Sequence, residues 1–351
     1  MYVSGLIALG SVLLVSLGCS VKPGAITAAG IDAPAVETLF AELRGDKRHD
    51  INGVLVVRDG QILAEAYFNG EDAESLHDIR SAGKSVTSIL VGIAIDLELL
   101  AGVDQPVVER LPPGLPPDKH AIKLGHLLTM RAGLDSDDED PRAPGNEDRM
   151  DESSDWLAFS YAIPMKWQPG ERYVYSSLSA FLAGAVVEHV AQMPLAEFAE
   201  RHLFAPLGIT RHSWRRGPHG EGVGQGNLRL CLRDMAKIGE LFLQGGVYRG
   251  KQVVSASWVR MSISSIVPTG AVDPYADAYG YMWYTKRHEI RGRSVLVHFA
   301  SGNGGNKIYI VPELATVIAI TSSAYGQPYG QQRSEWILLR ILEALQQPRT
   351  P

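Results

Sequence analysis

The sequence has few cysteines, no excess of basic residues and no internal repeat. Cys19 and Cys231 are the only cysteines in 351 residues, so neither a disulfide framework nor a cysteine-based zinc site is expected. Lys and Arg total 33 against 39 Asp and Glu, for a formal net charge of -6. This balance gives no indication of nucleic-acid binding. The lack of a repeat of ~20–50 residues excludes solenoids and propellers.

Several motifs of catalysis and metal binding are also missing. The ten histidines form no HExxH motif and no paired metal spacing, and no GxSxG elbow of the α/β hydrolases occurs. The letters GKS at 83–85 match the end of a phosphate-binding loop. That loop requires a glycine at position 78, where the carboxylate of Asp78 would repel phosphate. We therefore exclude a nucleotide site here.

The first twenty residues, MYVSGLIALGSVLLVSLGCS, contain an apolar run that ends in small residues and Cys19. A membrane helix needs ~20 apolar residues and a signal-peptide core ~7–15, so we predict a signal segment over residues 1–19. SLGC resembles the lipobox of bacterial lipoproteins, although Ser16 replaces the usual leucine and no Lys or Arg precedes the apolar core. We expect an exported protein of the cell envelope or periplasm, with Cys19 as a possible lipid anchor to a membrane. An uncleaved hydrophobic tail is the alternative.

The rest of the chain falls into three blocks. After a linker over residues 20–34 and a helical pattern, the strand-like runs GVLVVRDG and QILAEAYFNG are joined by the hairpin signal Asp59-Gly60. A helical spacing over residues 86–97 follows, and Gly102 is placed to end it. The middle third is rich in helical patterns broken by Pro and Gly, one of which starts at a partial capping box on Cys231. The last third contains the strand-like runs GYMWYT, SVLVHFA, KIYIVP and TVIAITS, and then a helical pattern.

Strands at both ends of the chain with helices between them predict one α/β (α+β) domain over residues 35–347. Its antiparallel sheet would be flanked by the terminal helices. We assign the α/β part to about 35–100 and 275–347, and an inserted all-α subdomain to about 101–274.

An acidic cluster occupies residues 135–155. It lacks the spacing and the turn glycine of an EF-hand calcium loop, so we interpret it as a solvated surface loop. Its members are Asp135, Asp137, Asp138, Glu139, Asp140, Glu147, Asp148, Asp151, Glu152 and Asp155.

Three short motifs are candidates for chemistry, and each has a plainer structural interpretation. Ser81 and Lys84 lie at i and i+3, so a helix that starts near Ser81 places the lysine next to the serine hydroxyl. The plainer interpretation is a serine cap with a solvated lysine.

Tyr175 and Ser177 form Tyr-x-Ser before a helical pattern, and a neighbouring cation would lower the tyrosine pKa from ~10. The alternative is a buried aromatic residue at a helix start.

The third motif is the glycine-rich segment 301–306, Ser-Gly-Asn-Gly-Gly-Asn, directly before a strand-like run. Its glycines would let a substrate approach the backbone closely, whereas the alternative is a hairpin turn.

Taken together, the three motifs resemble the serine β-lactamase and penicillin-binding-protein family in order, separation and context. The resemblance is closest to the class C-like branch, with its esterases and 6-aminohexanoate-dimer hydrolases, and covers about residues 40–345. The segments HDIRSAGKSVTSILVGIAID, LGHLLTMRAGL, PGERYVYSS and GNGGNKIYIVPE carry it. It implies the β-lactamase/transpeptidase-like fold, which agrees with the layout inferred above.

The resemblance also implies roles for individual residues. Ser81 would be the acylated nucleophile, Lys84 its cationic or proton-transfer partner, and Tyr175 the base for acylation. The oxyanion hole would comprise the backbone N–H groups of Ser81 and Asn306. Asn303, Gly304 and Gly305 would occupy the place of the family's Lys-Thr-Gly or His-x-Gly motif. No metal or organic cofactor is implied.

Two departures from the family pattern affect the expected substrate. Ser177 replaces the usual asparagine of the second motif, and its hydroxyl reaches less far. Asn303 is neutral where the family has a cation that holds a substrate carboxylate, and loss of a charge-assisted contact costs roughly 1.5–3 kcal/mol. Arg291 or Arg293 would have to face the site to compensate.

We therefore predict an exported serine hydrolase that cleaves a small-molecule ester or amide. Two alternatives stay open: a D-alanyl-peptide carboxypeptidase or β-lactamase, and a non-catalytic relative that binds peptidoglycan. A site role for His298 or Tyr161 is a minor hypothesis. Trp156, Trp167 and Trp283 are expected to be packing residues.

Overall fold

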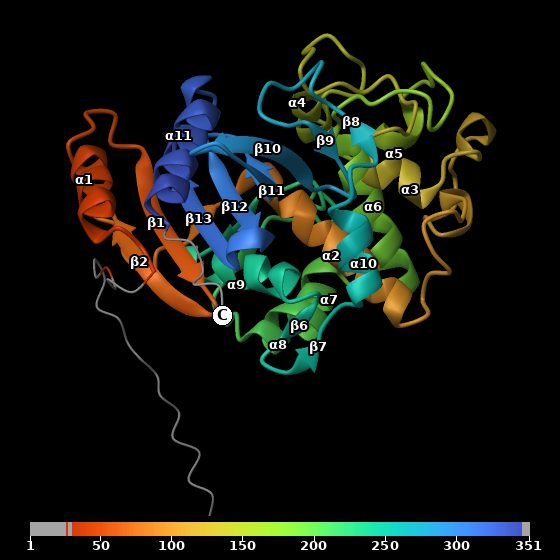
Figure 1. Cartoon of the computed structure of the whole chain (residues 1–351). Helices are drawn as coiled ribbons and strands as arrows, with labels where there is room; N and C mark the ends of the chain where they lie inside the picture. Colours follow the sequence, from red (N-terminus) through yellow and green to blue (C-terminus); the bar gives the residue numbers. More distant parts are fainter. Residues whose placement is uncertain (1–25, 27–29, 346–351) are drawn as a thin grey trace, which may run out of the picture.

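The structure of the chain is a computed structural model that describes Ile26 and residues 30–345. Cys19 and the rest of the predicted signal segment lie outside the described residues, so export and lipidation stay predictions. In the described part of the chain, an eight-stranded antiparallel sheet forms the centre of the fold (Figure 1). Its strands, in spatial order, are β2 (Gln61–Tyr67), β1 (Ile51–Arg58), β13 (Thr316–Ser322), β12 (Asn306–Val311), β11 (Arg293–Gly302), β10 (Tyr284–Ile290), β9 (Ala278–Tyr279) and β8 (Val267–Pro268).

The sheet joins the two ends of the chain, as the sequence predicts. β1 pairs with β2 on one side and with β13 on the other. Asp59 and Gly60 both have positive φ, 50° and 73°, and connect a pair formed by Arg58 and Gln61. Positive φ at both central residues is the requirement of a two-residue type I′ hairpin turn, so the predicted hairpin is confirmed.

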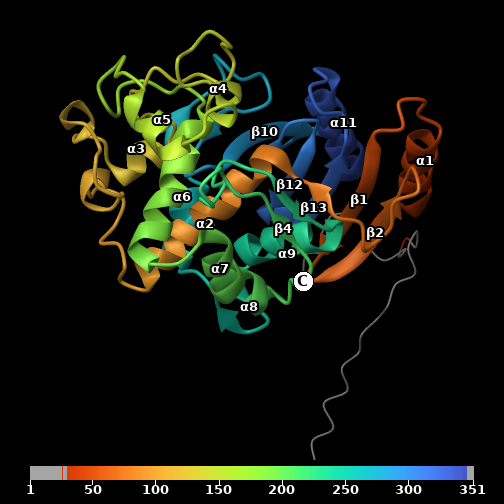
Figure 2. The same ribbon diagram turned by 180° about the vertical axis from the view of Figure 1, so that it is seen from behind.

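Helices cover both faces of the sheet. α1 (Ala33–Arg44) packs on α11 (Tyr329–Ala344), and α11 lies on β10, β12 and β13. α9 (Leu232–Leu243) lies on β1, β12 and β13, and α2 (Gly83–Asp96) contacts β11. Figure 1 shows α11 in front of the sheet, and the view from behind in Figure 2 brings α9 and α2 to the front. With both faces covered, every residue of β1 is buried.

α9 belongs to the sheet layer although the sequence assigns it to the all-α subdomain. Gly239 brings this helix close to the sheet, since a Cβ there would lie 2.5 Å from Cγ1 of Val317. The predicted partition is therefore wrong for α9. A helix on a sheet and a helix in a bundle have the same amphipathic period, and sequence periodicity cannot distinguish them.

The rest of the helical part surrounds α6 (Ser177–Ala191), which packs against α2, α3, α4, α5 and α7. Residues 177–187 of α6 are all buried, as expected of a central helix. The remaining elements are α3 (Leu124–Leu128), α4 (Glu147–Asp151), α5 (Trp156–Ala162), α7 (Leu195–Ala199), α8 (Ala205–Leu207), α10 (Ala256–Ser262), a sheet of β3 (His77–Asp78), β5 (Leu228–Leu230) and β4 (Ser213–Trp214), and a hairpin of β6 (Val247–Tyr248) and β7 (Lys251–Gln252).

Within the described residues, none of the individual helices has the length and apolar character needed to cross a bilayer. Ser177–Ala191 and Leu195–Leu207 meet that threshold only when they are taken together as a bent pair.

Two local predictions are wrong. α2 ends at Asp96, and the chain turns at Glu98, whose φ is 60°, so Gly102 is not the helix stop. The predicted strand over residues 280–285 is mostly a turn, because Gly280 N donates to Trp283 O and β10 begins at Tyr284. In both places a non-glycine residue adopts the left-handed conformation, which sequence pattern does not reveal.

Candidate active site

Ser81 lies where the sheet meets the helical part. It is in η1 (Arg80–Ala82), a single 3₁₀ turn before α2 that contacts β11 and β12. Arg80 has a φ of 52°, a conformation that costs a non-glycine residue of order 1–3 kcal/mol and clusters at functional sites. Asp78 Oδ1 accepts a hydrogen bond of 2.8 Å from Arg80 N. Asp78 therefore holds the strained residue that presents Ser81.

Lys84 is buried beside Ser81, with a side chain that is 1% exposed. Its Nζ donates to Ser81 Oγ at 2.8 Å, to Ser177 Oγ at 2.9 Å and to the backbone oxygen of Gln225 at 2.9 Å. All three ammonium protons therefore have an acceptor. The interpretation as a serine cap with a solvated lysine is wrong, because Ala82 is the N-cap of α2 and Lys84 is buried.

Tyr175 lies against the same ammonium. The Nζ atom of Lys84 is 5.0 Å from the centroid of the Tyr175 ring. Ser176 caps α6 through its side chain, and the cap places Tyr175 just before the helix and Ser177 in its first turn. The structure thus brings together all four side chains that the first two motifs predict.

The proton affinity of Lys84 and Tyr175 is set by burial and by neighbouring charges. Burial lowers the pKa of Lys84, but Tyr175 and nearby carboxylates outweigh this effect and raise that pKa above its usual value. Burial also raises the pKa of Tyr175, and the opposing charge of Lys84 does not offset it. Both groups are therefore protonated at rest, and the pair must lose one proton before it can accept one from Ser81.

The acidic segment 135–155 forms a wall of the cleft. The predicted solvation is confirmed for Glu139, Asp148, Asp151 and Glu152, which are exposed, and is wrong for Asp138. Asp138 Oδ2 accepts a hydrogen bond of 2.7 Å from Ser177 N, and Asp138 N donates to Tyr175 O at 3.1 Å. Burial raises the pKa of Asp138 to about 6, against the attraction of Lys84. The wall also includes Asp137, Glu139, Glu147, Asp148 and Asp151.

Sequence reasoning missed Asp138 because its partner is far along the chain. Asp138 and Ser177 are separated by 39 residues, and no local spacing links them. The density of carboxylates was visible in the sequence, but a solvated loop has the same composition.

The third motif connects β11 to β12, and only part of it faces the cleft. Gly302, Asn303 and Gly304 line the cleft. Gly302 packs so closely on the nucleophile turn that a Cβ would lie 2.0 Å from Ile79 O. Gly305 packs on α11 instead, where a Cβ would lie 2.3 Å from Gly330 O.

Asn306 stabilises this connection and does not line the cleft. Its fully buried side chain donates to Asn303 O at 2.9 Å and to Ser322 O at 3.0 Å, and accepts from Ser322 N at 3.0 Å. Asn306 is not among the residues that line the cleft, so its backbone N–H does not fit the predicted oxyanion role. The end of β11, at Gly302, is the part of the motif that contacts the turn carrying Ser81.

Lys307 places a cation in the cleft, although sequence reasoning found none in the third motif. It is 2% exposed, and its Nζ donates to Ser301 Oγ at 2.8 Å and lies 4.7 Å from the centroid of the Phe299 ring. Burial lowers the pKa of Lys307 to about 7. Lys307 pairs with Ser301 across the ladder, and a hairpin drawn through the glycine-rich turn would have revealed this pairing.

Arg291 and Arg293 do not take the place of that cation. Arg293 begins β11 and Arg291 lies in the turn before it, and the strand from Arg293 to Ser301 spans about 26 Å at ~3.3 Å per residue. Neither arginine lines the cleft that holds Ser81.

The minor candidates are mostly structural. His298 bonds to Thr285 Oγ1 through Nδ1 at 3.0 Å, and burial lowers its pKa to about 4. Tyr161 donates to Pro112 O at 2.7 Å. Neither His298 nor Tyr161 lines the cleft.

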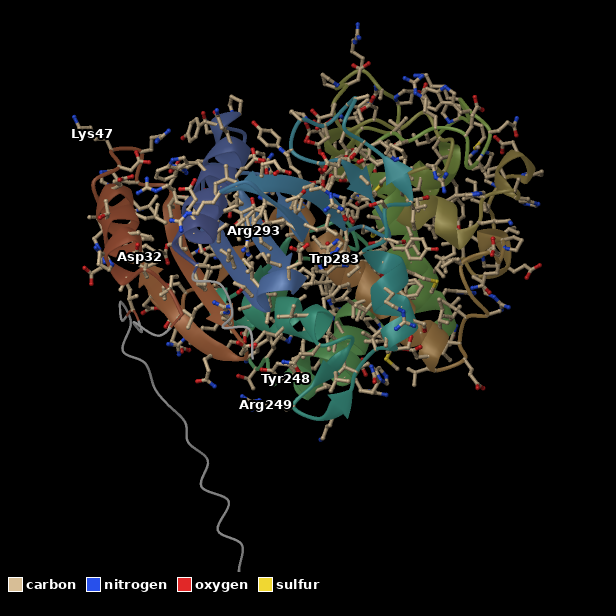
Figure 3. All side chains as sticks on the ribbon, viewed as in Figure 1. Asp32, Lys47, Tyr248, Arg249, Trp283 and Arg293 are labelled. Atoms are coloured by element: carbon tan, nitrogen blue, oxygen red, sulfur yellow. The ribbon has the colours of Figure 1, made fainter. Side chains whose placement is uncertain are left out.

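The three tryptophans differ in environment. Trp156 and Trp283 are fully buried, and Trp283 lies between the sheet and the helices (Figure 3). The packing prediction is confirmed for these two. Trp167, however, lines the cleft.

Ser81, Asp138, Tyr175 and Lys307 line one cleft of about 970 Å³. Lys84 does not line it but bonds to the Ser81 hydroxyl, and the N–H groups of the turn at Ser81 favour an oxyanion. Such an arrangement suits acyl transfer. The described residues include no group of three or more His, Cys, Asp or Glu placed to hold a metal ion.

Comparison with known proteins agrees with this chemistry. A family model described as Beta-lactamase matches residues 36–341. The chain is 26% identical over 282 residues to the 6-aminohexanoate-dimer hydrolase of Paenarthrobacter ureafaciens, covering 77% of this chain and 71% of the relative.

Solved structures with the same fold include two enzymes. The D-amino acid amidase from Ochrobactrum anthropi SV3, complexed with L-phenylalanine amide, is 17% identical with a TM-score of 0.67, covering 89% of this chain and 97% of that chain. The beta-lactamase/D-alanine carboxypeptidase from Yersinia pestis, complexed with citrate, is 18% identical with a TM-score of 0.66, covering 84% and 93%.

Proposed function

The chain belongs to the beta-lactamase family of serine hydrolases, and from this premise we propose that it cleaves an ester or amide through an acyl-enzyme on Ser81. The observation that carries the proposal is the 2.8 Å hydrogen bond from the buried Lys84 ammonium to Ser81 Oγ. A lysine buried against a serine at the floor of a cleft places a proton-transfer group at a nucleophile.

Acylation requires a proton to leave Ser81 as its Oγ attacks the carbonyl carbon. The Lys84–Tyr175 pair, once it has lost one proton, accepts this proton and passes it to the leaving alcohol or amine. The carbonyl oxygen becomes an oxyanion, and we assign the N–H of Ser81, in the turn before α2, as one of its donors. The second donor then lies on the cleft-facing end of β11 instead of at Asn306.

Deacylation follows the same proton-transfer steps, with water as the nucleophile. Water attacks the acyl carbon, the same pair takes a proton from it, and Ser81 Oγ leaves with that proton. The products are the free acid and the regenerated serine. Neither step requires a metal or an organic cofactor.

A substrate panel tests the proposal. Short-chain p-nitrophenyl esters, linear amides and a chromogenic cephalosporin are assayed with the wild type and with Ser81→Ala. We expect hydrolysis of esters or amides by the wild type and a loss of at least about 10³-fold in kcat/KM in the variant. Equal rates with both proteins would contradict the proposal.

Lys307 supports a second candidate, a D-alanyl-peptide carboxypeptidase. Such a substrate ends in a carboxylate, and Lys307 offers a cation within the cleft. The D-alanine carboxypeptidase activity in the name of the structural relative from Yersinia pestis points in the same direction. Release of D-alanine from a peptide ending in D-alanyl-D-alanine by the wild type, and its absence with Ser81→Ala, would favour this candidate.

We also propose that the protein is exported and lipid-anchored through Cys19. The support comes from the sequence alone, namely an apolar run followed by SLGC. Cells fed a labelled fatty acid should incorporate label into the wild type and not into Cys19→Ala. Equal incorporation would contradict lipidation, and recovery of the wild type only in the cytoplasm would contradict export.

A further inference from the structure

The turn at residues 79–82 contains a strained residue directly before Ser81. Arg80 has a φ of 52°, and its side chain is 39% exposed and lines the cleft. A non-glycine residue keeps this left-handed conformation only when its surroundings hold it there. Asp78 binds the Arg80 N–H. A second element, the loop at residues 323–328 between β13 and α11, contacts both Asp78 and Arg80.

Tyr325, in that loop, contacts the strained turn in two ways. Its Oη donates to the backbone oxygen of Asp78 at 2.9 Å, and Arg80 Cζ lies 4.3 Å from the centroid of its ring. A guanidinium over an aromatic ring is attracted by the π face of the ring. Tyr325 is half-buried and, unlike Arg80, does not line the cleft. Any effect of Tyr325 on Ser81 is therefore transmitted through Asp78 and Arg80.

The third motif holds the loop that carries Tyr325. Asn303 Oδ1 accepts a hydrogen bond of 2.7 Å from Gly326 N. Gly304 has a φ of 84°, and a Cβ there would lie 3.0 Å from the carbonyl carbon of Ala324. Glycine at this position lets the loop approach so closely. The neutral Asn303 thus has a structural partner, at a position where the family resemblance implies a cation.

Tyr329, four residues further along the chain, makes the same kinds of contact away from the nucleophile. Its Oη donates to Asp50 Oδ2 at 2.6 Å, and Arg48 Cζ lies 4.9 Å from the centroid of its ring. Tyr329 is also half-buried and does not line the cleft. The two tyrosines therefore differ mainly in the segment that they hold, and Tyr329 is a matched control for Tyr325.

We propose that Tyr325 is a positioning residue for the nucleophile. By holding Asp78 and the Arg80 guanidinium, it keeps the turn in its left-handed conformation and keeps Ser81 Oγ at 2.8 Å from Lys84 Nζ. Relaxation of the turn would move the hydroxyl away from the group that takes its proton, and a displacement of about 1 Å costs ~100-fold in rate. This inference rests on the proposed acylation of Ser81.

The test compares kcat and KM for p-nitrophenyl butyrate in two variants of Tyr325. Tyr325→Phe keeps the ring and loses the hydroxyl, whereas Tyr325→Leu loses both contacts. We expect kcat to fall about 5-fold in Tyr325→Phe and about 50-fold in Tyr325→Leu, with KM changed by no more than about twofold, because both half-reactions occur at Ser81 Oγ. Tyr329→Phe and Tyr329→Leu should change kcat by no more than about twofold.

An unchanged kcat in Tyr325→Leu, or an equal fall in Tyr329→Leu, would overturn the inference. If Tyr325→Leu does not fold, Tyr325→Phe decides in the same way against Tyr329→Phe. A failure of the acyl-enzyme proposal is visible separately, as equal hydrolysis by the wild type and Ser81→Ala.

A second comparison tests whether Tyr325 acts through Arg80. Glycine adopts a positive φ without strain, so Arg80→Gly removes both the strained residue and the guanidinium that Tyr325 holds. In this background we expect Tyr325→Leu to lower kcat by no more than about threefold, against the 50-fold loss expected with Arg80 present. Equal losses in the two backgrounds would mean that Tyr325 does not act through Arg80 and would overturn the inference.

Discussion

At the residue scale, Asp138 couples the acidic wall to the proton-transfer pair. Its carboxylate raises the pKa of Lys84, and its hydrogen bond to Ser177 N fixes it at the start of α6. The active form of the Lys84–Tyr175 pair has one proton less than the resting form. Because the Asp138 carboxylate stabilises the Lys84 ammonium, a higher pH is needed to remove that proton. The pH dependence of catalysis therefore depends on Asp138.

The first prediction concerns Asp138→Asn. Removing the negative charge lowers the pKa of Lys84, so the pair loses its proton at a lower pH. We expect the acidic limb of the kcat/KM–pH profile to move down by roughly one pH unit. Asp148→Asn is the control, since Asp148 lines the same cleft but is not a main cause of the Lys84 shift. A limb that stays in place or moves up in Asp138→Asn would contradict the account.

A second prediction concerns Lys307 and substrate charge. The ammonium should favour acyl or leaving groups with a carboxylate, by about 10-fold or more for a charge-assisted contact. Lys307→Met should remove this preference, measured as the ratio of kcat/KM for a p-nitrophenyl succinate and a p-nitrophenyl butyrate. Lys286→Met is the control, because Lys286 bonds to Glu335 and does not line the cleft.

The pH dependence of that preference has a definite sign. The pKa of Lys307 is lowered to about 7, so the side chain is an ammonium below this pH and a neutral amine above it. The succinate preference of the wild type should fall as pH rises through 7 and be absent in Lys307→Met at every pH. A preference that is constant from pH 6 to pH 8, across about one pH unit on either side of the pKa, would contradict this role.

At the element scale, the site depends on close backbone packing around the nucleophile turn. Gly302 of β11 contacts Ile79 and Ala82, and Gly226 of the loop before β5 contacts Arg80 and Ser81. These contacts position Ser81 through the backbone of its turn. The glycines of the third motif thus pack against the nucleophile turn and α11 as well as line the cleft.

The third prediction is that Gly302→Ala damages both stability and activity. Its Cβ would lie 2.0 Å from a backbone oxygen that cannot rotate away, so we expect a loss of about 1–3 kcal/mol in the free energy of unfolding. Displacement of Ser81 should lower kcat/KM about 100-fold. Gly45→Ala is the control, since its new Cβ would meet its nearest neighbour at an ordinary 3.5 Å. Equal behaviour of the two variants would contradict the packing role.

Local sequence signals predicted the helices and turns well, but they did not predict which elements pack against one another. The Asp59-Gly60 hairpin and the helix that carries Lys84 follow from turn chemistry and periodicity, and both are confirmed. The end of α2 and the placement of α9 were wrong, because a left-handed residue or a sheet contact leaves no periodic signal. Lys307 was missed for another reason: its partner Ser301 is only six residues away, but the pairing appears only when a hairpin is drawn through the glycine-rich turn.

At the scale of the whole molecule, elements from the two ends of the chain pack into one sheet-and-helix layer. β1 is paired with β13, α1 packs on α11, and α9 from the middle of the chain lies on the sheet. The layout from both chain ends was predictable, because strand patterns occur at both ends and the family resemblance implies the same fold. The boundary between sheet layer and helical part was not predictable.

The fourth prediction is that the molecule unfolds in one cooperative transition. Trp283 is fully buried between the sheet and the helices and stacks on Phe242 of α9 at a centroid distance of 4.2 Å. Its fluorescence should therefore change at the same denaturant concentration as the far-ultraviolet circular dichroism. Trp283→Phe identifies the contribution of this residue. Two separate transitions would mean that the sheet and the helical part are independent.

The most direct test of the central claim is the mass of the protein after reaction with a fluorophosphonate. Fluorophosphonates form a stable adduct with an activated serine, and peptide mapping locates it. The account predicts one adduct per chain, on Ser81, and none on Ser81→Ala under the same conditions. An unmodified wild type, or an adduct that forms equally on Ser81→Ala, would contradict the assignment of Ser81 as the nucleophile.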